Sequence, residues 1–263
     1  MKTFSLDVLG GPWTRRLAAR REGLEVDWGH LAHEANAEQV ATAREVWTRT
    51  AFSEYASGAC FAEISSALLA ANAPIDLVAA AGEFVADEMF HAELAARVAT
   101  ALGGAVPLEV DVTKLVRPAR SAKPLVRAAE LIVRTCCVGE ALTVPMLNQS
   151  RRAAGSKGIE AVITRILRDE SQHAQLGWWF FDWAELHDGE REVLGRLAGE
   201  TLRAFTVLFA GECRRTSGLG ALDCAKFDGE FLRAVREEVV GPLAERGIVV
   251  PLHDVEELIA AAA

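Results

Sequence analysis

The sequence contains two copies of a motif in which an acidic pair is followed, three residues later, by histidine. The stretch ADEMFHAEL ends at Leu94 and the stretch RDESQHAQL ends at Leu176, so both copies read Asp-Glu-x-x-His-Ala-x-Leu. On a helix, residues three apart lie on the same face, about one turn from each other. Each copy therefore offers a carboxylate and an imidazole to one point: Glu88 with His91, and Glu170 with His173. Such oxygen and nitrogen donors are typical ligands of a transition-metal ion.

A further glutamate precedes each copy in a similar setting. Glu63 ends the stretch ACFAE and Glu140 ends the stretch CCVGE, so both follow the pattern Cys-x-x-Glu. We count residues from each expected interhelical turn, at about 1.5 Å of helix axis per residue. By this count, each glutamate is expected at nearly the same height along its helix as the motif on the following helix. The sequence therefore predicts six metal ligands: Glu63, Glu88, His91, Glu140, Glu170 and His173.

The positions beside both motifs are mostly apolar, which predicts that the motifs face the protein interior. Val85 and Leu94 flank the first motif, and Ile166 and Leu176 flank the second. Four carboxylates gathered in a low-dielectric interior must be protonated or neutralised, because they repel one another and burial penalises their charged form. Two divalent cations supply four matching positive charges, and neutral imidazoles add ligands without adding charge. We therefore expect a dinuclear metal centre.

The aspartate in front of each motif glutamate has an expected role as well. Asp87 and Asp169 are rotated by about 100° from the metal-facing line, toward a neighbouring helix. A histidine that binds a metal usually donates its second ring N–H to a carboxylate, which fixes its tautomer and orientation. We predict crossed pairs, in which Asp87 holds His173 and Asp169 holds His91.

Helices are the expected elements along most of the chain. Segments rich in Ala, Leu, Glu and Arg carry apolar residues at three- and four-residue intervals, and alternating β-branched runs are absent. The main helices are expected at 53–71 with an extension back to about 38, and at 74–102, 124–154, 158–186 and 190–214. Weaker helical patterns follow at 230–246 and 255–262.

The segment 103–123 has no periodicity and is long for a loop inside a compact domain. About 20 extended residues can run the length of a ~30-residue helix, so this segment can join two helical hairpins end to end. The expected fold class is all-α, a four-helix bundle with a long crossover between its second and third helices and additional C-terminal helices. We expect a single domain over 1–263, with the bundle at about 51–186, an N-terminal extension at 1–37 and the additional helices at 188–263.

The composition is that of an ordinary globular protein, with 263 residues, 51% apolar and 25% charged. The formal net charge of −9 argues against a nucleic-acid partner, because a duplex requires a basic surface. The N-terminal residues lack the apolar core of a signal peptide, and no run approaches the ~18 apolar residues of a membrane span. We therefore expect a cytoplasmic protein with no membrane partner. The five cysteines form no Cys-x-x-Cys pair and are expected to be reduced thiols.

The ligand set resembles that of the di-iron carboxylate branch of the ferritin-like superfamily, in which two helices give one glutamate each and two give Glu-x-x-His. The aspartate before each motif glutamate is most similar to the hydroxylase subunits of bacterial multicomponent monooxygenases. The resemblance covers about Tyr55 to Leu186, half of the chain. It implies a ferritin-like four-helix bundle that binds two iron ions and uses O2 as co-substrate. A manganese or mixed Mn/Fe centre stays open, because these ligands accept either ion.

Other subfamilies fit the sequence less well. The single tyrosine, Tyr55, lies two turns from Glu63 and off its face, which disfavours the radical chemistry of the small subunit of ribonucleotide reductase. Ile166 stands where arylamine N-oxygenases carry a further histidine. The cysteine spacing also excludes the cysteine-ligated iron domain of rubrerythrins.

The activity implied by the resemblance is that of an O2-dependent oxidase or oxygenase acting on a small, largely apolar organic molecule. An external electron donor, a ferredoxin or a reductase, is the expected partner, and a homodimer stays open. The alternative is a ferroxidase that handles iron without an organic substrate. A third interpretation is a bundle that keeps the ligands for stability alone. The hydrophobic lining of the four helices, without an acidic path for iron, favours the first.

The residues beside the two lone glutamates are candidates for a substrate pocket, with plain packing as the alternative. They are small or weakly polar: Ser66, Ala67, Cys136, Thr143 and Val144. His30 and His33 have three-residue spacing but no apolar face around them, so surface positions are expected. The aromatic run at 177–183 is expected in the core rather than in a substrate wall.

Overall fold

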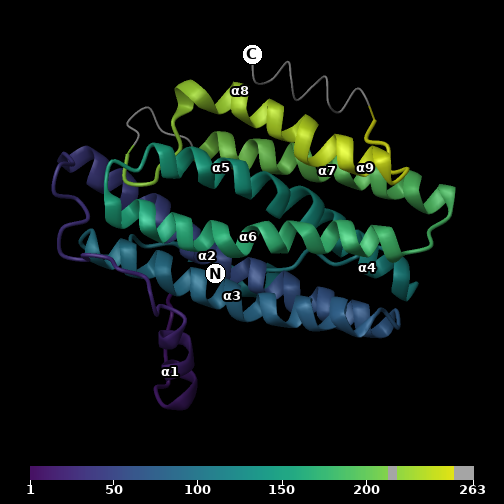
Figure 1. Cartoon of the computed structure of the whole chain (residues 1–263), viewed down its shortest axis with the longest axis horizontal. Helices are drawn as coiled ribbons and strands as arrows, with labels where there is room; N and C mark the ends of the chain where they lie inside the picture. Colours follow the sequence, from purple (N-terminus) through teal and green to yellow (C-terminus); the bar gives the residue numbers. More distant parts are fainter. Residues whose placement is uncertain (213–217, 252–263) are drawn as a thin grey trace.

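The computed structural model describes residues 1–212 and 218–251, and this part of the chain is mostly helical, as expected (Figure 1). The long helices are α2 (Ala37–Ala70), α3 (Ile75–Ala101), α6 (Lys157–Trp183) and α7 (Asp188–Glu212), with the continuous run α4 (Pro124–Ile132), η2 (Val133–Glu140) and α5 (Ala141–Arg152). Shorter helices are α1 (Pro12–Ala19), η1 (Val112–Lys114), α8 (Cys224–Ala234), η3 (Val235–Val240) and α9 (Gly241–Glu245). Among the described residues, no helix combines the length and the apolar character needed to cross a membrane.

The first long helix is a single element that includes the extension expected from about residue 38. It begins after Asn36, whose side-chain oxygen accepts from the Gln39 backbone N–H at 2.9 Å, while the Gln39 side chain accepts from the Asn36 N–H at 3.0 Å. This capping box satisfies two backbone donors that the first helical turn leaves free. The helical pattern expected at 255–262 lies outside the described residues.

Four long helical stretches lie side by side and carry all the predicted ligands. They are α2, α3, α6 and the run from α4 to α5, which are drawn roughly parallel along the long axis of the molecule (Figure 1). α2 contacts α3 and α4, and α6 contacts α3, η2 and α5. The later helices cover this group, since α7 contacts η2 and α4, while α8 and η3 contact α5.

The segment between α3 and α4 is a crossover that returns the chain along the molecule. α3 ends at the left of Figure 1 and α4 begins at the right. The crossover is attached to the helices at several points. The Arg44 guanidinium donates to the Gly104 carbonyl at 2.7 Å, and the Val106 N–H donates to the Thr48 hydroxyl at 3.1 Å. The strand β2 (Glu109–Val110) in the same segment pairs antiparallel with β1 (Lys2–Thr3) at the N-terminus.

The third long helix departs from the expectation of one regular α-helix over 124–154. Residues Val133–Glu140 form a π-helix, and the α-helix resumes at Ala141 and contains Pro145 in its interior. A π segment widens the turn, and such segments are rare and frequent at functional sites. Because η2 ends at Glu140, the widened turns set the direction in which this predicted ligand points.

The apolar interior consists of two clusters that meet the two motif histidines separately. Phe61 and Phe84 belong to one cluster, and their rings lie 5.0 and 4.3 Å from the His173 ring, centroid to centroid. Phe90 belongs to the other cluster, and its ring lies 6.2 Å from the His91 ring. The polar group that contains both histidines is therefore enclosed by apolar side chains on both sides.

The aromatic run in α6 only partly follows the expectation of core packing. Gly177, Phe180 and Phe181 are buried, whereas Trp179 and Trp183 are exposed by 46% and 37%. The run does not line the cavity described below, so a role as a substrate wall is not supported by its position.

The end of the described chain packs against α7 at a glycine. A Cβ atom added to Gly195 would lie 2.1 Å from the Val249 carbonyl oxygen, which is backbone and cannot rotate away. Gly189, in the first turn of the same helix, has open space around the corresponding position.

We predict that Gly195→Ala lowers the free energy of unfolding by about 1–3 kcal/mol, because the new methyl group displaces the 248–250 segment. Chemical denaturation followed by circular dichroism measures this change. Gly189→Ala is the matched control, and it should leave the midpoint unchanged or raise it slightly, since alanine favours the helix. Equal midpoints for the two variants would contradict the packing described here.

Candidate metal centre

Four side chains of the two repeated motifs converge in the interior of the molecule. Glu88 and His91 come from α3, Glu170 and His173 come from α6, and all four are fully buried. The predicted ligand Glu140, at the end of η2, joins them and is 6% exposed.

A glutamate that the sequence analysis did not select completes the group. Glu54 on α2 is 9% exposed, and its Oε2 lies 3.8 Å from Nδ1 of His91. The predicted ligand Glu63 is elsewhere: its side chain is 39% exposed and pairs with the guanidinium of Arg127. The position assigned to Glu63 is therefore corrected to Glu54.

The helical geometry of α2 explains this correction. Nine residues at about 100° each amount to two and a half turns, so Glu54 and Glu63 point to opposite sides of the helix. Glu54 belongs to the buried stripe, between Ala51 and Gly58, and Glu63 does not. This stripe continues at three- and four-residue intervals along the sequence, and it was the signal that could have identified Glu54.

The six side chains form two overlapping groups of possible ligands. One group is Glu54, Glu88, His91 and Glu170, and the other is Glu88, Glu140, Glu170 and His173. Within each group, one ligand atom per residue lies within 4.8 Å of all the others. Glu88 and Glu170 belong to both groups, so their carboxylates lie between two adjacent positions. The two groups could therefore hold metal ions, with Glu88 and Glu170 as shared ligands.

In each of the two imidazole rings, the two nitrogens have different surroundings. Nδ1 of His91 lies 3.0 Å from Glu170 and 3.7 Å from Glu88. Nδ1 of His173 lies 2.9 Å from Glu170 and 3.2 Å from Glu88. Both rings thus turn Nδ1 toward the shared carboxylates and leave Nε2 directed away from them.

The two motif aspartates lie behind the histidines in the crossed arrangement. Oδ2 of Asp169 is 3.0 Å from Nε2 of His91, within hydrogen-bonding distance, and Oδ2 of Asp87 is 3.6 Å from Nε2 of His173. Each aspartate is in turn paired with an arginine, Asp169 with Arg165 of the same helix. Asp87 pairs with Arg20, which follows α1 in the N-terminal segment. A hydrogen-bonded carboxylate behind an imidazole fixes the tautomer that presents Nδ1 to a metal. This holds for Asp169 and His91, whereas Asp87 lies near His173 without a hydrogen bond.

Glu54 and Glu140 each belong to just one of the two groups, and burial is the main influence on their pKa values. It raises the pKa of Glu54 and of Glu140 well above the ordinary value for a carboxyl group, and repulsion from Glu88 and Glu170 acts in the same direction. Ser57 on α2 donates a hydrogen bond of 2.8 Å to Oε1 of Glu140, which holds one of its oxygens in place.

For the two histidines, the nearby carboxylates together have a larger effect on the pKa than burial has. Burial favours their neutral form, but the charge of Glu170 and the hydrogen bond to Asp169 outweigh it and raise the pKa of His91 well above 6.5. The nearby carboxylates of Asp87, Glu170 and Glu88 similarly outweigh burial and raise the pKa of His173 to about 12. The carboxylates thus attract positive charge strongly, and a bound cation would displace protons from the same atoms.

Several ligand atoms at the centre of the group lack hydrogen bonds, which indicates a site for cations rather than a complete hydrogen-bond network. Both oxygens of Glu88, Nδ1 of His91 and Oε1 of Glu170 form no hydrogen bond of suitable geometry with a described residue, although they lie close to other members of the group. Buried polar atoms are normally hydrogen-bonded, because leaving them unpaired costs about 1–3 kcal/mol each. Oxygen and nitrogen donors in this proportion suit divalent transition-metal ions. The buried Glu/His group can therefore hold metal ions.

A cavity of about 440 Å³ extends beside the group, between α2, the η2–α5 run and α7. Glu54 and Glu140 both line it, together with mostly apolar side chains that include Trp47, Phe205 and Phe209. Of the five residues expected to outline a pocket, only Thr143 lines this cavity. Ala67 and Cys136 are buried in the apolar core, Ser66 is exposed, and Val144 is half-buried.

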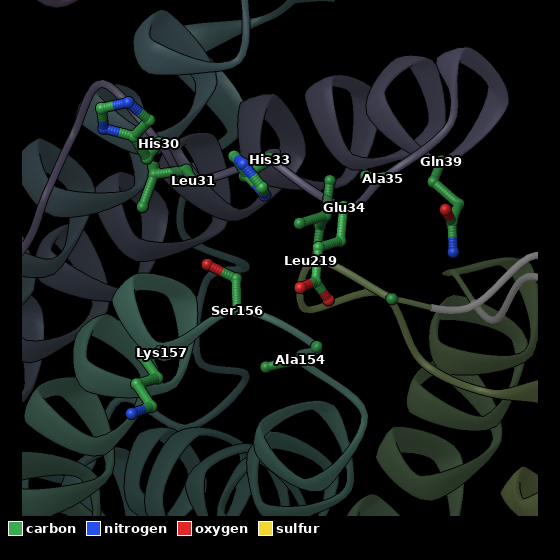
Figure 2. A pocket seen from close by; sticks show the side chains of 12 residues that line it. His30, Leu31, His33, Glu34, Ala35, Gln39, Ala154, Ser156, Lys157 and Leu219 are labelled. Atoms are coloured by element: carbon green, nitrogen blue, oxygen red, sulfur yellow. The ribbon is translucent and has the colours of Figure 1, made fainter.

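A second hollow lies far from the motifs and contains His30 and His33 (Figure 2). Figure 2 shows the 30–39 segment facing Ala154, Ser156 and Lys157 across an open space. His30 pairs with Asp27 at the surface, at 2.8 Å, and neither histidine belongs to a group of possible metal ligands. The expected surface positions of these two histidines agree with this placement.

The cysteines that the structure describes are free thiols, as expected from their spacing. They are Cys60, Cys136 and Cys137. Burial raises the pKa of the Cys60 thiol to about 11 and that of the Cys136 thiol well above its ordinary value, so both thiols are protonated. The side chains of Cys213 and Cys224 lie outside the described residues.

Comparison with known proteins gives no further assignment, because no protein-family model, curated protein or solved structure matches the chain. The site is therefore interpreted from its own geometry.

The corrected ligand is tested by a pair of glutamate variants on α2. We predict that Glu54→Ala lowers the cobalt(II) bound per chain from about two to about one, because one of the two groups loses a terminal carboxylate. Glu63→Ala removes the same charge from the opposite side of the helix and should leave the stoichiometry unchanged. Elemental analysis after desalting measures both. A loss in Glu63→Ala alone would restore the original assignment.

The aspartate behind His91 is tested by a second pair of variants. We predict that Asp169→Asn weakens metal binding by about 10- to 100-fold, because an amide no longer accepts the imidazole N–H as strongly as a carboxylate does. Competition with a chromogenic chelator measures the affinity. Asp182→Asn also removes an α6 aspartate that pairs with an arginine, and it should have no effect, because exposed Asp182 pairs with Arg246 after α9, away from the histidines. Equal affinities for Asp169→Asn and the unmodified protein would remove Asp169 from the site.

Proposed function

We propose that the protein is an O2-activating oxidase or oxygenase with a dinuclear non-haem iron centre in a ferritin-like four-helix bundle. The order of the ligands along the chain supports this. A glutamate on α2 is followed by Glu-x-x-His on α3, and a glutamate on η2 is followed by Glu-x-x-His on α6. Two helical hairpins joined by a long crossover, with ligands of this kind facing inward, are typical of ferritin-like carboxylate proteins.

Two iron ions held by this group would supply the electrons that reduce O2, and manganese or a mixed centre fits the same donors. The protein's own part is to hold the donors in place. Glu88 and Glu170 belong to both groups of possible ligands and would be shared by the two cations, whereas Glu54 and Glu140 would each hold one cation. Since Ser57 holds only one oxygen of Glu140, the other oxygen stays available to a cation.

The observation that carries the proposal is the cavity that reaches Glu54 and Glu140. A cofactor with no access to substrate would serve structure alone, whereas this cavity provides space beside the terminal ligands on one side of the group. Its mostly apolar wall favours a small, largely apolar organic molecule and excludes much of the water that would otherwise surround the reacting atoms. An external electron donor, a ferredoxin or a reductase, belongs to the proposal.

A ferroxidase that stores or detoxifies iron is the alternative function. Hydrated Fe(II) would be guided by carboxylates, since a hard cation is attracted by oxygen ligands along its route. Among the described residues that line the cavity, the acidic ones are Glu54 and Glu140, and two arginines also line it. The charge of the cavity is thus poorly suited to conduct iron, which supports the oxygenase over the ferroxidase.

The proposed function is tested by anaerobic titration with Fe(II) followed by exposure to O2. We predict that about two Fe(II) bind per chain and are oxidised once, with no further O2 consumption when more Fe(II) is added. An oxygen electrode and a colorimetric iron assay measure the two quantities. Continuing O2 consumption, with iron retained far above two per chain, would instead support the ferroxidase.

Histidine variants locate this reaction within the molecule. His91→Ala and His173→Ala should each abolish the rapid O2 consumption while the helical circular dichroism signal persists. His30→Ala is the control and should behave as the unmodified protein does, since His30 lies at the surface. O2 consumption that survives in both His91→Ala and His173→Ala would place the chemistry outside the proposed centre.

A further inference from the structure

The cavity beside the Glu/His group is elongated, and the group lies along its side. On α2 its lining residues run from Val46 to Cys60, a distance of about 21 Å at 1.5 Å per residue. On the neighbouring run they extend from Arg134 to Ser150. Glu54 and Glu140 fall between these ends. A slender molecule lying in the cavity would therefore pass the metal ligands with its middle part.

Three of the seven hydroxyl residues that line the cavity are hydrogen-bonded within the protein, and most of the remaining lining residues are apolar. The hydroxyl of Thr50 donates to the Val46 carbonyl at 3.1 Å, and that of Thr201 donates to the Leu197 carbonyl at 2.7 Å. The hydroxyl of Ser57 donates to Glu140. Because these hydroxyls are engaged within the protein, they present mainly their carbon atoms to the cavity. The middle of the cavity is thus suited to an apolar chain.

One end of the cavity carries the guanidinium of Arg134, which forms no ion pair with a described carboxylate, although the buried Glu130 lies one turn before it on the same helical run. Nε of Arg134 donates to the Glu130 carbonyl at 3.1 Å, and Nη1 donates to the Pro118 carbonyl at 3.4 Å. Nη2 is buried and has no hydrogen-bond partner among the described residues, and no described carboxylate forms an ion pair with this guanidinium. Leaving a cationic donor unpaired is costly, so an anion that reaches the Arg134 guanidinium through the cavity would gain a charge-assisted hydrogen bond.

A second arginine lies at the same end. Arg117, on the crossover between α3 and α4, is exposed and lines the cavity together with Leu115. Arg117 directly precedes Pro118, whose carbonyl accepts a hydrogen bond from Arg134, so the two arginines lie at the same end of the cavity. Two arginines at one end of an apolar cavity are typical of a site that recognises a carboxylate by charge-assisted hydrogen bonds.

We propose that the cavity binds a slender apolar molecule with a carboxylate at one end, and that Arg134 and Arg117 bind this carboxylate while the apolar part extends past Glu54 and Glu140. Arg134 precedes Glu140 by six residues on the same helical run, which corresponds to at most ~9 Å along its axis. The carboxylate is thus held away from the metal ligands, and a carbon several bonds along the chain lies beside them. As a statement about substrate, the inference rests on the proposed function and narrows its substrate class to amphiphilic carboxylic acids.

Octanoate and 1-octanol test the inference, because they share a chain length and differ in charge. Isothermal titration calorimetry is performed anaerobically on the full chain loaded with Fe(II). We expect octanoate to bind at least about 10-fold more tightly than 1-octanol, and Arg134→Gln to abolish this preference. Arg196→Gln, which removes an exposed arginine on α7 that pairs with Glu192, is the control and should retain the preference.

Two outcomes would overturn the inference. One is equal affinity for octanoate and 1-octanol in the unmodified protein. The other is a preference for octanoate that persists in Arg134→Gln, since the carboxylate would then bind elsewhere, for example at the metal ions. If Arg134→Gln does not fold, Arg117→Gln at the exposed mouth replaces it, with a several-fold loss of octanoate affinity expected and an unchanged affinity contradicting the inference.

The same measurements separate this inference from the proposed function. Arginine-dependent octanoate binding without O2 consumption would leave the carboxylate site in place and remove the oxygenase. Rapid O2 consumption with no preference for octanoate would retain the oxygenase and remove the carboxylate site.

Discussion

Four carboxylates buried in one cluster require nearby positive charge, and the surrounding structure depends on meeting this requirement. The apolar clusters on both sides exclude the water that would otherwise screen the repulsion. The protein supplies imidazoles in direct contact, and behind them aspartates that are themselves paired with arginines. Because the central oxygens of Glu88 still lack partners among the described residues, this compensation is incomplete without bound cations. A site of this kind destabilises the fold unless it binds metal or protons.

Glycines allow neighbouring helices to approach closely near the buried carboxylates. A Cβ added to Gly58 on α2 would meet the end of the Met89 side chain at 2.4 Å and the Glu88 Cβ at 3.3 Å. On the other side, a Cβ added to Gly177 on α6 would lie 2.6 Å from the Cys137 sulfur. Within each hairpin, the two helices are thus packed tightly near the ligands, which fixes the separation of the carboxylates. The looser side of the site faces α7, and the cavity lies there.

The sequence predicts those parts of the site that depend on local geometry. Glu88 with His91, and Glu170 with His173, follow from the helical repeat alone, and the crossed aspartates follow from their rotation on the same helices. The choice of Glu63 failed because it rested on a likeness between ACFAE and CCVGE, which the structure places differently. Cys60 lines the cavity in a regular α-helix, whereas Cys137 is buried in the core within a π-helix, so equal spacing leads to different directions. The cavity was missed for another reason, since α7 forms one of its walls through contacts between segments far apart in the sequence.

The two arginines that support the motif aspartates differ in their distance along the chain, although the motifs themselves are alike. Arg165 lies one helical turn before Asp169 and is in place as soon as α6 forms. Arg20 lies 67 residues before Asp87 and reaches it only when the N-terminal segment has docked on α3. Bringing Arg20 to Asp87 closes a loop of many residues, which costs conformational entropy. The Arg165–Asp169 pair has no such cost, because both residues lie on one helix. Fraying of the N-terminus would therefore loosen the surroundings of His173 and leave those of His91 intact, so the apparent symmetry of the repeat does not extend to the dynamics of its two halves.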